Sequence, residues 1–222
     1  MSITSSPIGI FDSGVGGLTV LKALRERMPD EQYIYLGDTA RLPYGTKTAD
    51  TVRRYALNAA AHLNRQQVKL LVVACNTASS FALDEVAVAS PVPVVGVVQP
   101  GARTALLTGA DRIGVVGTEG TIRSAAYQTA LAGLGRGVEV RALPCPLFVP
   151  LAEEGWGDHP VTDQIARHYL TPLLEWGAQT LILGCTHYPL LRPSLHRVVG
   201  PNVHLVDSAS AVAEAVITDH AE

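Results

Sequence analysis

Residues 71–79 decide the fold, and they read Leu71-Val72-Val73-Ala74-Cys75-Asn76-Thr77-Ala78-Ser79. An apolar run of this kind is typical of a strand that is buried on both faces of a parallel sheet. Cys75 then lies at the carboxyl end of the strand. Asn76 and Thr77 can cap a helix that we expect from Ala78 to about Val88. Ligands of open parallel sheets bind at this edge, so Cys75 lies where a site is expected.

The same pattern returns far downstream, in Thr180-Leu181-Ile182-Leu183-Gly184-Cys185-Thr186-His187-Tyr188-Pro189. A second buried strand again ends in a cysteine, which threonine and a polar residue follow. Segments 8–14 and 112–121 form another similar pair, so two pairs recur at offsets of 105 and 110 residues. Such recurrence indicates an internal duplication. We therefore expect two halves that face each other across a single site.

Apolar strands and helical segments alternate along the whole chain, which favours parallel sheets with right-handed crossovers. The expected strands are residues 8–11, 33–36, 69–74, 92–98, 112–117, 138–143, 180–184 and 203–206. The expected helices are residues 18–28, 49–66, 78–88, 100–108, a segment ending near 134, 147–154, 161–176, a helix that starts after Cys185, and a short tail.

The sequence thus predicts an α/β fold with two pseudo-symmetric domains, each a mostly parallel sheet flanked by helices. We set the boundary near Val98. Residues 1–98 then form an N-terminal domain carrying Cys75, and residues 99–207 form a second domain carrying Cys185. We expect the tail, residues 208–222, to return to the first domain.

Composition restricts the function. Hydrophobic residues make up 47% and charged residues 17% of the 222, which is enough for a large core. A net charge of −3 does not suggest the basic surface that binds nucleic acid or an anionic membrane. Residues 1–7 are polar, and the apolar runs are too short to span a bilayer. Three cysteines without close spacing suggest reduced thiols in the cytoplasm.

Cys75 and Cys185 are the first candidates for chemistry. Both directly precede an expected helix, whose dipole favours the thiolate. The alternative is that each is an ordinary buried residue, since cysteine is commonly buried. The matched pair, with polar residues on the C-terminal side of both, favours function. Cys145 lies in a Pro-Cys-Pro loop without that setting, and we interpret it as structural.

The segment from Asp12 to Gly17 joins an expected strand to an expected helix through a glycine-rich turn. Such turns offer backbone N–H groups to an anion. The glycine spacing does not fit the dinucleotide fingerprint, and the lysine of a phosphate loop is missing. A simple tight turn is the alternative. As an anion site, it would suit an amino-acid carboxylate better than a triphosphate.

Other ionisable side chains near strand ends or in loops are Asp12, Asp38, Glu153 and His187. Each of them could instead be a cap or a surface charge. His187, two residues after Cys185, is best positioned to tune a thiol. The Cys185-x-His187 spacing does not match a zinc site, so we predict no metal. None of the three lysines ends a strand, as expected for a pyridoxal Schiff base, so we predict no cofactor.

Five motifs occur in an order that closely resembles glutamate racemases, within the cofactor-independent aspartate/glutamate racemase superfamily. The motifs are Asp12-Ser13-Gly14-Val15-Gly16-Gly17-Leu18, Pro43-Tyr44-Gly45, Cys75-Asn76-Thr77-Ala78-Ser79, Gly117-Thr118-Glu119-Gly120-Thr121 and Gly184-Cys185-Thr186-His187-Tyr188-Pro189. The resemblance runs from about residue 8 to residue 208. The residues after each cysteine resemble the glutamate branch rather than the aspartate branch.

The resemblance implies racemisation of L- and D-glutamate by a two-thiol proton transfer at Cα, which supplies D-glutamate for peptidoglycan. It assigns catalytic roles to Cys75, Cys185, Asp12, Glu153 and His187, with Glu154 as the alternative to Glu153. It assigns substrate binding to Asp12, Ser13, Tyr44, Gly45, Asn76, Thr77, Thr186 and His187, with Thr118 and Thr121 nearby. The expected partner is glutamate, and a homodimer is left open. Family members usually continue well beyond the pair matched by Asp207-Ser208, so we expect a shortened tail to limit stability.

Two rival functions are kept open. One is racemisation of aspartate or another amino acid. The other is a non-catalytic protein that closes two lobes over an amino acid. Binding alone needs no pair of thiols, so exchange of the substrate α-hydrogen with solvent deuterium distinguishes a racemase from a binding protein.

Overall fold

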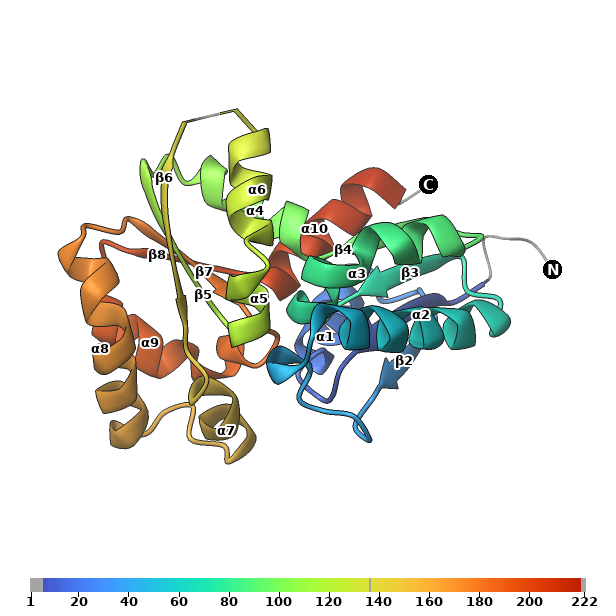
Figure 1. The fold of residues 1–222 in the computed structure, drawn as a ribbon, viewed down its shortest axis with the longest axis horizontal. Coiled ribbons are helices and arrows are strands. Elements are labelled where there is room, and N and C mark those ends of the chain that lie inside the picture. Colours follow the sequence, from blue (N-terminus) through green and yellow to red (C-terminus); the bar gives the residue numbers. More distant parts are fainter. Residues whose placement is uncertain (1–5, 136, 221–222) are drawn as a thin grey trace.

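A computed structural model describes residues 6–135 and 137–220 of the chain. Two four-stranded parallel sheets lie beside each other, each flanked by helices (Figure 1). The predicted α/β class with two similar sheets is therefore confirmed. The first five residues of the polar segment 1–7, and the ends of the predicted domain ranges at 1–5 and 221–222, lie outside the described residues.

The first sheet has the strand order β2-β1-β3-β4. Its strands are β1 (Ile8–Asp12), β2 (Tyr33–Gly37), β3 (Leu70–Val73) and β4 (Val94–Gly96). The helices α1 (Leu18–Arg27), α2 (Ala49–Arg65) and α3 (Asn76–Ala89) and the 3-10 turn η2 (Tyr44–Thr46) connect them.

Both faces of this sheet are covered, which explains the continuous apolar strands. Leu71 and Val73 pack in the cluster with α2 and α3, whereas Leu70 and Val72 pack in the cluster with α1. Successive side chains of a strand point to opposite faces, so a strand between two helical layers needs apolar residues at every position.

The second sheet repeats this arrangement with the order β6-β5-β7-β8. Its strands are β5 (Arg112–Gly117), β6 (Glu139–Pro144), β7 (Thr180–Gly184) and β8 (His204–Asp207). Its helices are α4 (Val98–Leu107), α5 (Glu119–Arg123), α6 (Ala126–Gly133), α7 (Phe148–Glu153), α8 (Pro160–Glu175) and α9 (Arg192–Val199), with the 3-10 turn η3 (Tyr188–Leu191). Leu181 and Leu183 pack against the α8 and α9 side, and Ile182 against α4 and α6.

The last helix, α10 (Ser208–His220), leaves β8 of the second sheet and packs against α1 of the first. Its Ala209, Val212 and Val216 join the core cluster that contains Ile8 and Ile10. Between β4 and α4 the chain passes from the first sheet to the second, and there Val97 packs with the first sheet and Val98 with the second. These contacts support the division into residues 1–98 with 208–222 and residues 99–207, which stays a prediction.

Several predicted boundaries are wrong. The strand expected over 92–98 is reduced to β4, because the backbone of Val97 turns helical and its N–H donates to Ser79 Oγ at 3.3 Å. The helix ending near residue 134 is two helices, α5 and α6, separated by Ala125 with a left-handed φ of 55°. The helices expected from Ala78 and from Pro100 each begin two residues earlier, at Asn76 and at Val98.

Within residues 6–135 and 137–220, no helix combines the length and apolar character needed to cross a bilayer.

Candidate active site

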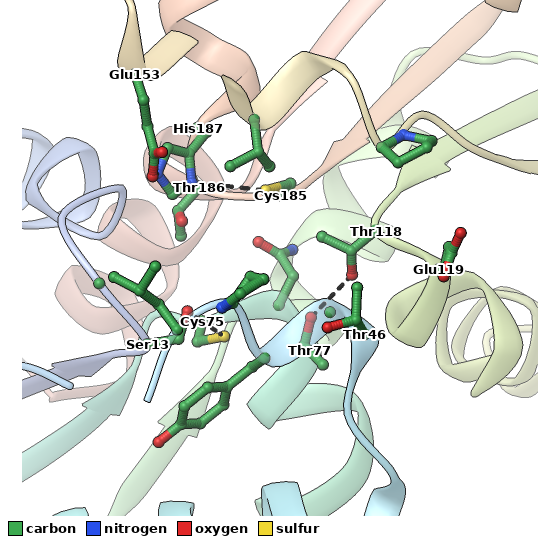
Figure 2. Close-up of a pocket in the computed structure, with 18 of the residues that line it drawn as sticks. Ser13, Thr46, Cys75, Thr77, Thr118, Glu119, Glu153, Cys185, Thr186 and His187 are labelled. Carbon is green, nitrogen blue, oxygen red and sulfur yellow. Dashed lines mark hydrogen bonds and ion pairs between the residues drawn. The ribbon is translucent and has the colours of Figure 1, made fainter. Parts of the chain in front are cut away.

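The carboxyl ends of both sheets face one cavity of about 280 Å³ (Figure 2). Because neighbouring strands of each sheet are parallel and paired in register, the residues just beyond their carboxyl ends lie side by side. Phe11 pairs with Val73, so Ser13 and Cys75 emerge side by side, and Gly117 pairs with Gly184, so Thr118 and Cys185 do the same. The cavity is lined by Ser13, Gly14, Leu42, Pro43, Tyr44, Gly45, Thr46, Cys75, Asn76, Thr77, Thr118, Glu119, Pro146, Val149, Pro150, Glu153, Cys185, Thr186 and His187.

Cys75 and Cys185 lie on opposite sides of this cavity, Cys75 on the first sheet and Cys185 on the second (Figure 2). Both thiols are buried. They are therefore shielded from bulk water, and a group held between them can be approached from two faces.

Cys75 is itself the N-cap of α3, a role that we had predicted for Asn76 and Thr77. Its Sγ accepts the N–H of Ala78 at 3.5 Å and lies 3.5 Å from Ser13 Oγ. A sulfur in this position satisfies one of the free N–H groups of the first turn. Burial, and then the charge of Asp12, raise the pKa of Cys75 to about 11. The helix N-terminus therefore does not outweigh desolvation.

Cys185 directly follows β7, and the next element is the 3-10 turn η3 rather than an α-helix. The expectation that a helix dipole lowers its pKa is wrong, because burial raises the pKa of Cys185 well above its ordinary value. His187 Nδ1 lies 3.9 Å from the thiol sulfur. The other ring nitrogen, Nε2, is 3.2 Å from Glu153 Oε1, at ion-pair distance but outside hydrogen-bond geometry.

Of the two neighbouring glutamates, Glu153 lines the cavity and contacts His187. It is the last residue of α7, and Glu154 is the cap residue that follows. The geometry therefore favours Glu153 over Glu154, and its catalytic role stays a prediction.

Asp12 is fully buried below the cavity rather than in its wall. Its carboxylate accepts the N–H of Gly14 at 2.9 Å and the hydroxyl of Thr186 at 3.4 Å. Burial raises the pKa of this carboxyl group. The Gly14 amide thus donates inward to Asp12, and the turn binds a carboxylate of the chain itself.

Three threonine hydroxyls connect the two sheets at one end of the cavity. Thr77 Oγ1 lies 2.9 Å from Thr118 Oγ1 and 3.2 Å from Thr121 Oγ1. Thr118 also caps α5. Thr77 and Thr118 line the cavity, and Thr121 is buried behind them. The cluster is a ready source of neutral donors for an anion.

Tyr44 and Gly45 enter the cavity wall from η2. The Tyr44 hydroxyl donates to Asp38 Oδ2 at 2.7 Å, and Arg41 pairs with the other oxygen of Asp38 at 2.8 Å. Asp38, named only as an ionisable candidate, therefore holds Tyr44 from outside the cavity.

Sequence reasoning missed several wall residues. Leu42, Pro146, Val149 and Pro150 give the cavity an apolar rim, and Thr46 and Glu119 contribute polar groups. Leu42 and Thr46 flank the motif of residues 43–45 and Glu119 lies within the motif of residues 117–121, so position in the chain was a signal for these three. The other three lie in the loop before α7 or on α7, away from the five motifs, where the sequence offered no signal. Cys145, predicted to be structural, is buried with its sulfur 3.8 Å from the carbonyl of Leu143. Among the described residues, no group of three His, Cys, Asp or Glu side chains could hold a metal ion.

The raised pKa of Cys75 predicts a loss of stability in alkali. The pKa rises from 9.0 to about 11 on folding, so the stabilisation is complete below pH 9 and is lost as pH rises through about 11. We expect Cys75→Ala to lose less unfolding free energy than the wild type between these values, by on the order of 2 kcal/mol. Urea titrations of both proteins at several pH values measure the difference. Parallel curves would contradict the prediction.

The family model described as Asp/Glu/Hydantoin racemase matches residues 18–216. Glutamate racemase of Geobacter metallireducens is 56% identical over 210 residues, which are 94% of this chain and 78% of that protein. The crystal structure of glutamate racemase from Thermus thermophilus, in complex with β-chloro-D-alanine, is 50% identical with a TM-score of 0.88 and covers 96% of this chain and 80% of that one. The Francisella tularensis glutamate racemase in complex with D-glutamate is 38% identical with a TM-score of 0.90, at the same coverage. With its two facing thiols, the chain belongs to the Asp/Glu/Hydantoin racemase family and lies among its glutamate racemases.

Proposed function

We propose that this enzyme interconverts L- and D-glutamate by proton transfer at Cα between two thiols. The observation that carries the proposal is the position of Cys75 and Cys185, on opposite sides of one cavity (Figure 2). Relatives at about half identity are glutamate racemases, and one related structure holds D-glutamate. Glutamate is thus the substrate that the similarity favours over aspartate.

The reaction balances without a redox partner. One cysteine, as thiolate, takes the α-proton, and the electron pair of the broken C–H bond stays on the substrate as a carbanion delocalised into the α-carboxylate. The opposite thiol breaks its S–H bond and forms the new C–H bond on the other face. Thiol and thiolate have then exchanged roles, so the enzyme is ready for the reverse direction.

Burial favours the protonated form of both thiols, so each needs a nearby group that can take a proton. His187 is next to Cys185, and Glu153 is at ion-pair distance to stabilise an imidazolium. Asp12, whose pKa burial raises, is the corresponding acceptor near Cys75. A general base works best when its pKa is close to the working pH, and burial moves the pKa of a carboxyl group upward in that direction.

The two substrate carboxylates would be held by neutral donors, because the described wall of the cavity contains no arginine or lysine. Ser13, Thr77, Thr118 and Thr186 supply hydroxyls, and the first turn of α3 supplies backbone N–H groups. Preorganised donors in a site shielded from water stabilise the developing charge strongly. Gly45 and Tyr44 would close the same wall.

We further propose that the enzyme works in the cytoplasm, where thiols stay reduced, and that its D-glutamate is used for peptidoglycan.

Turnover is expected to need no added cofactor. Purified protein dialysed against a chelator and treated with hydroxylamine should racemise glutamate in D₂O as fast as untreated protein does, with deuterium at Cα.

We expect kcat/KM for aspartate to be lower than that for glutamate by at least about tenfold, since the lost methylene leaves one carboxylate misplaced.

The outcomes separate the rival functions. Binding of glutamate without deuterium exchange would indicate a non-catalytic binding protein. Faster turnover of aspartate would move the chain to another branch. Loss of activity that metal or pyridoxal phosphate restores would contradict the cofactor-independent mechanism.

A further inference from the structure

Tyr127 lies on α6, outside every motif that identified the site. Its side chain is fully buried. The phenolic oxygen accepts a hydrogen bond from Asn76 Nδ2 at 2.8 Å. Asn76 is the residue directly after Cys75, so a residue of the second sheet's layers fixes the turn that carries the first thiol.

The ring of Tyr127 reaches the second thiol as well. A Cβ at Gly184, the residue directly before Cys185, would lie only 3.1 Å from Tyr127 Cε2. On α4, a Cβ at Gly101 would lie 3.3 Å from Cε1. Two glycines thus give the ring its space, and the ring packs tightly against the end of β7. One side chain contacts the neighbours of both thiols.

Ser208, the first residue of α10, forms a second bridge between the same two places. Asn76 Nδ2 donates to Ser208 Oγ at 3.0 Å, and Ser208 Oγ donates to the carbonyl of Leu183 at 3.1 Å. Leu183 lies on β7, two residues before Cys185. The Asn76 amide nitrogen therefore has two protein partners, both of which lead to β7.

We propose that Tyr127 is a positioning residue that, with Ser208, sets the separation of Cys75 and Cys185. The inference rests on the proposed two-thiol function. Two-sided proton transfer needs both sulfurs within reach of one Cα, and small misplacements of reacting groups are costly. A buried amide held by two hydrogen bonds has little freedom, because breaking either bond leaves a polar group unsatisfied. The bridges thus fix Asn76, and with it Cys75, relative to the strand end that carries Cys185.

Tyr127→Phe keeps the ring against Gly184 and removes the acceptor for Asn76. We expect kcat for racemisation to fall about tenfold with little change in KM. The specific readout is the ratio of α-deuterium exchange in recovered substrate to inversion, measured in D₂O. A displaced second thiol delays delivery to the carbanion, so the S–H formed on the first thiol has time to exchange with D₂O and to return a deuteron to the same face. The ratio should therefore rise. A smaller folded fraction would lower exchange and inversion equally and leave the ratio unchanged.

Tyr33→Phe is the matched control, since it removes a tyrosine hydroxyl that donates to the Met28 carbonyl at 2.9 Å, away from the cavity. It should leave kcat and the ratio unchanged. Ser208→Ala breaks the other bridge and should also raise the ratio, which keeps the test available if Tyr127→Phe does not fold. A wild-type ratio in folded Tyr127→Phe or Ser208→Ala would overturn the inference alone. A wild-type protein that neither exchanges nor inverts would overturn the proposed function.

Discussion

Cys75→Ala and Cys185→Ala are each expected to abolish racemisation in both directions, with losses of at least about 10³-fold in kcat. In the proposed mechanism, each thiol is the base in one direction and the acid in the other, so removing either thiol interrupts both directions. The two sulfurs lie on opposite sides of the cavity, where neither can act on both faces of a bound Cα. Rates measured from L- and from D-glutamate test the prediction directly.

The double variant should be hardly worse than either single one, because groups that act as one unit are not additive. Cys145→Ala is the matched control. That cysteine is also buried, but its sulfur contacts the Leu143 carbonyl outside the cavity wall. It should stay active. Substantial racemisation by folded Cys75→Ala or Cys185→Ala, with circular dichroism like the wild type, would refute the two-thiol mechanism.

The strands were predictable because of the layers on both sides of each sheet. Leu71 and Leu181 belong to runs in which every position is apolar, and each run packs against helices on two faces. Such runs indicate a parallel sheet without knowledge of its neighbours. The edge strand β4 was less predictable, since the hydrogen bond from Val97 to Ser79 that ends it joins residues 18 apart.

The sequence argument found the positions of the two thiols at strand ends correctly, but the pKa values that it suggested for them were wrong. Cysteines at strand ends before helices suggested low pKa values, yet desolvation raises the pKa of both. A helix terminus contributes about 0.3–1 kcal/mol in ordinary settings, whereas burial shifts thiols and other groups by several pKa units. The degree of burial depends on how closely two distant sheets approach, which local sequence does not contain.

Contacts between the two sheets were the least predictable part of the site. Thr77 meets Thr118, and Asn76 meets Tyr127 and Ser208, across 41 to 132 residues of chain. A single sequence does not show which residues of one sheet layer meet which residues of the other. Asn76 illustrates the consequence: the resemblance assigns it to the substrate, and its amide nitrogen bonds to the protein.

Gly16 shows how closely the two halves of the site approach each other. Gly16 is buried in the turn between β1 and α1, and a Cβ there would overlap Thr186 Oγ1 and lie 2.5 Å from His187 Nδ1. Thr19, in the first turn of α1, donates to the Thr186 carbonyl at 3.1 Å. The two halves of the site thus touch at a position where there is space only for hydrogen.

Gly16→Ala is therefore expected to lower kcat/KM about 10²-fold while the protein stays folded. The added methyl group must displace the Thr186 hydroxyl and the His187 ring or push the turn after β1 away from them, and either change disturbs the residues next to Cys185. Gly133→Ala, at the end of α6, is the control, because its Cβ would meet nothing within 4 Å. It should be fully active and as stable as the wild type or slightly more so, since alanine favours the helix. Initial rates with circular dichroism compare the two variants, and equal activity would mean that the halves can separate by a methyl group without cost to proton transfer.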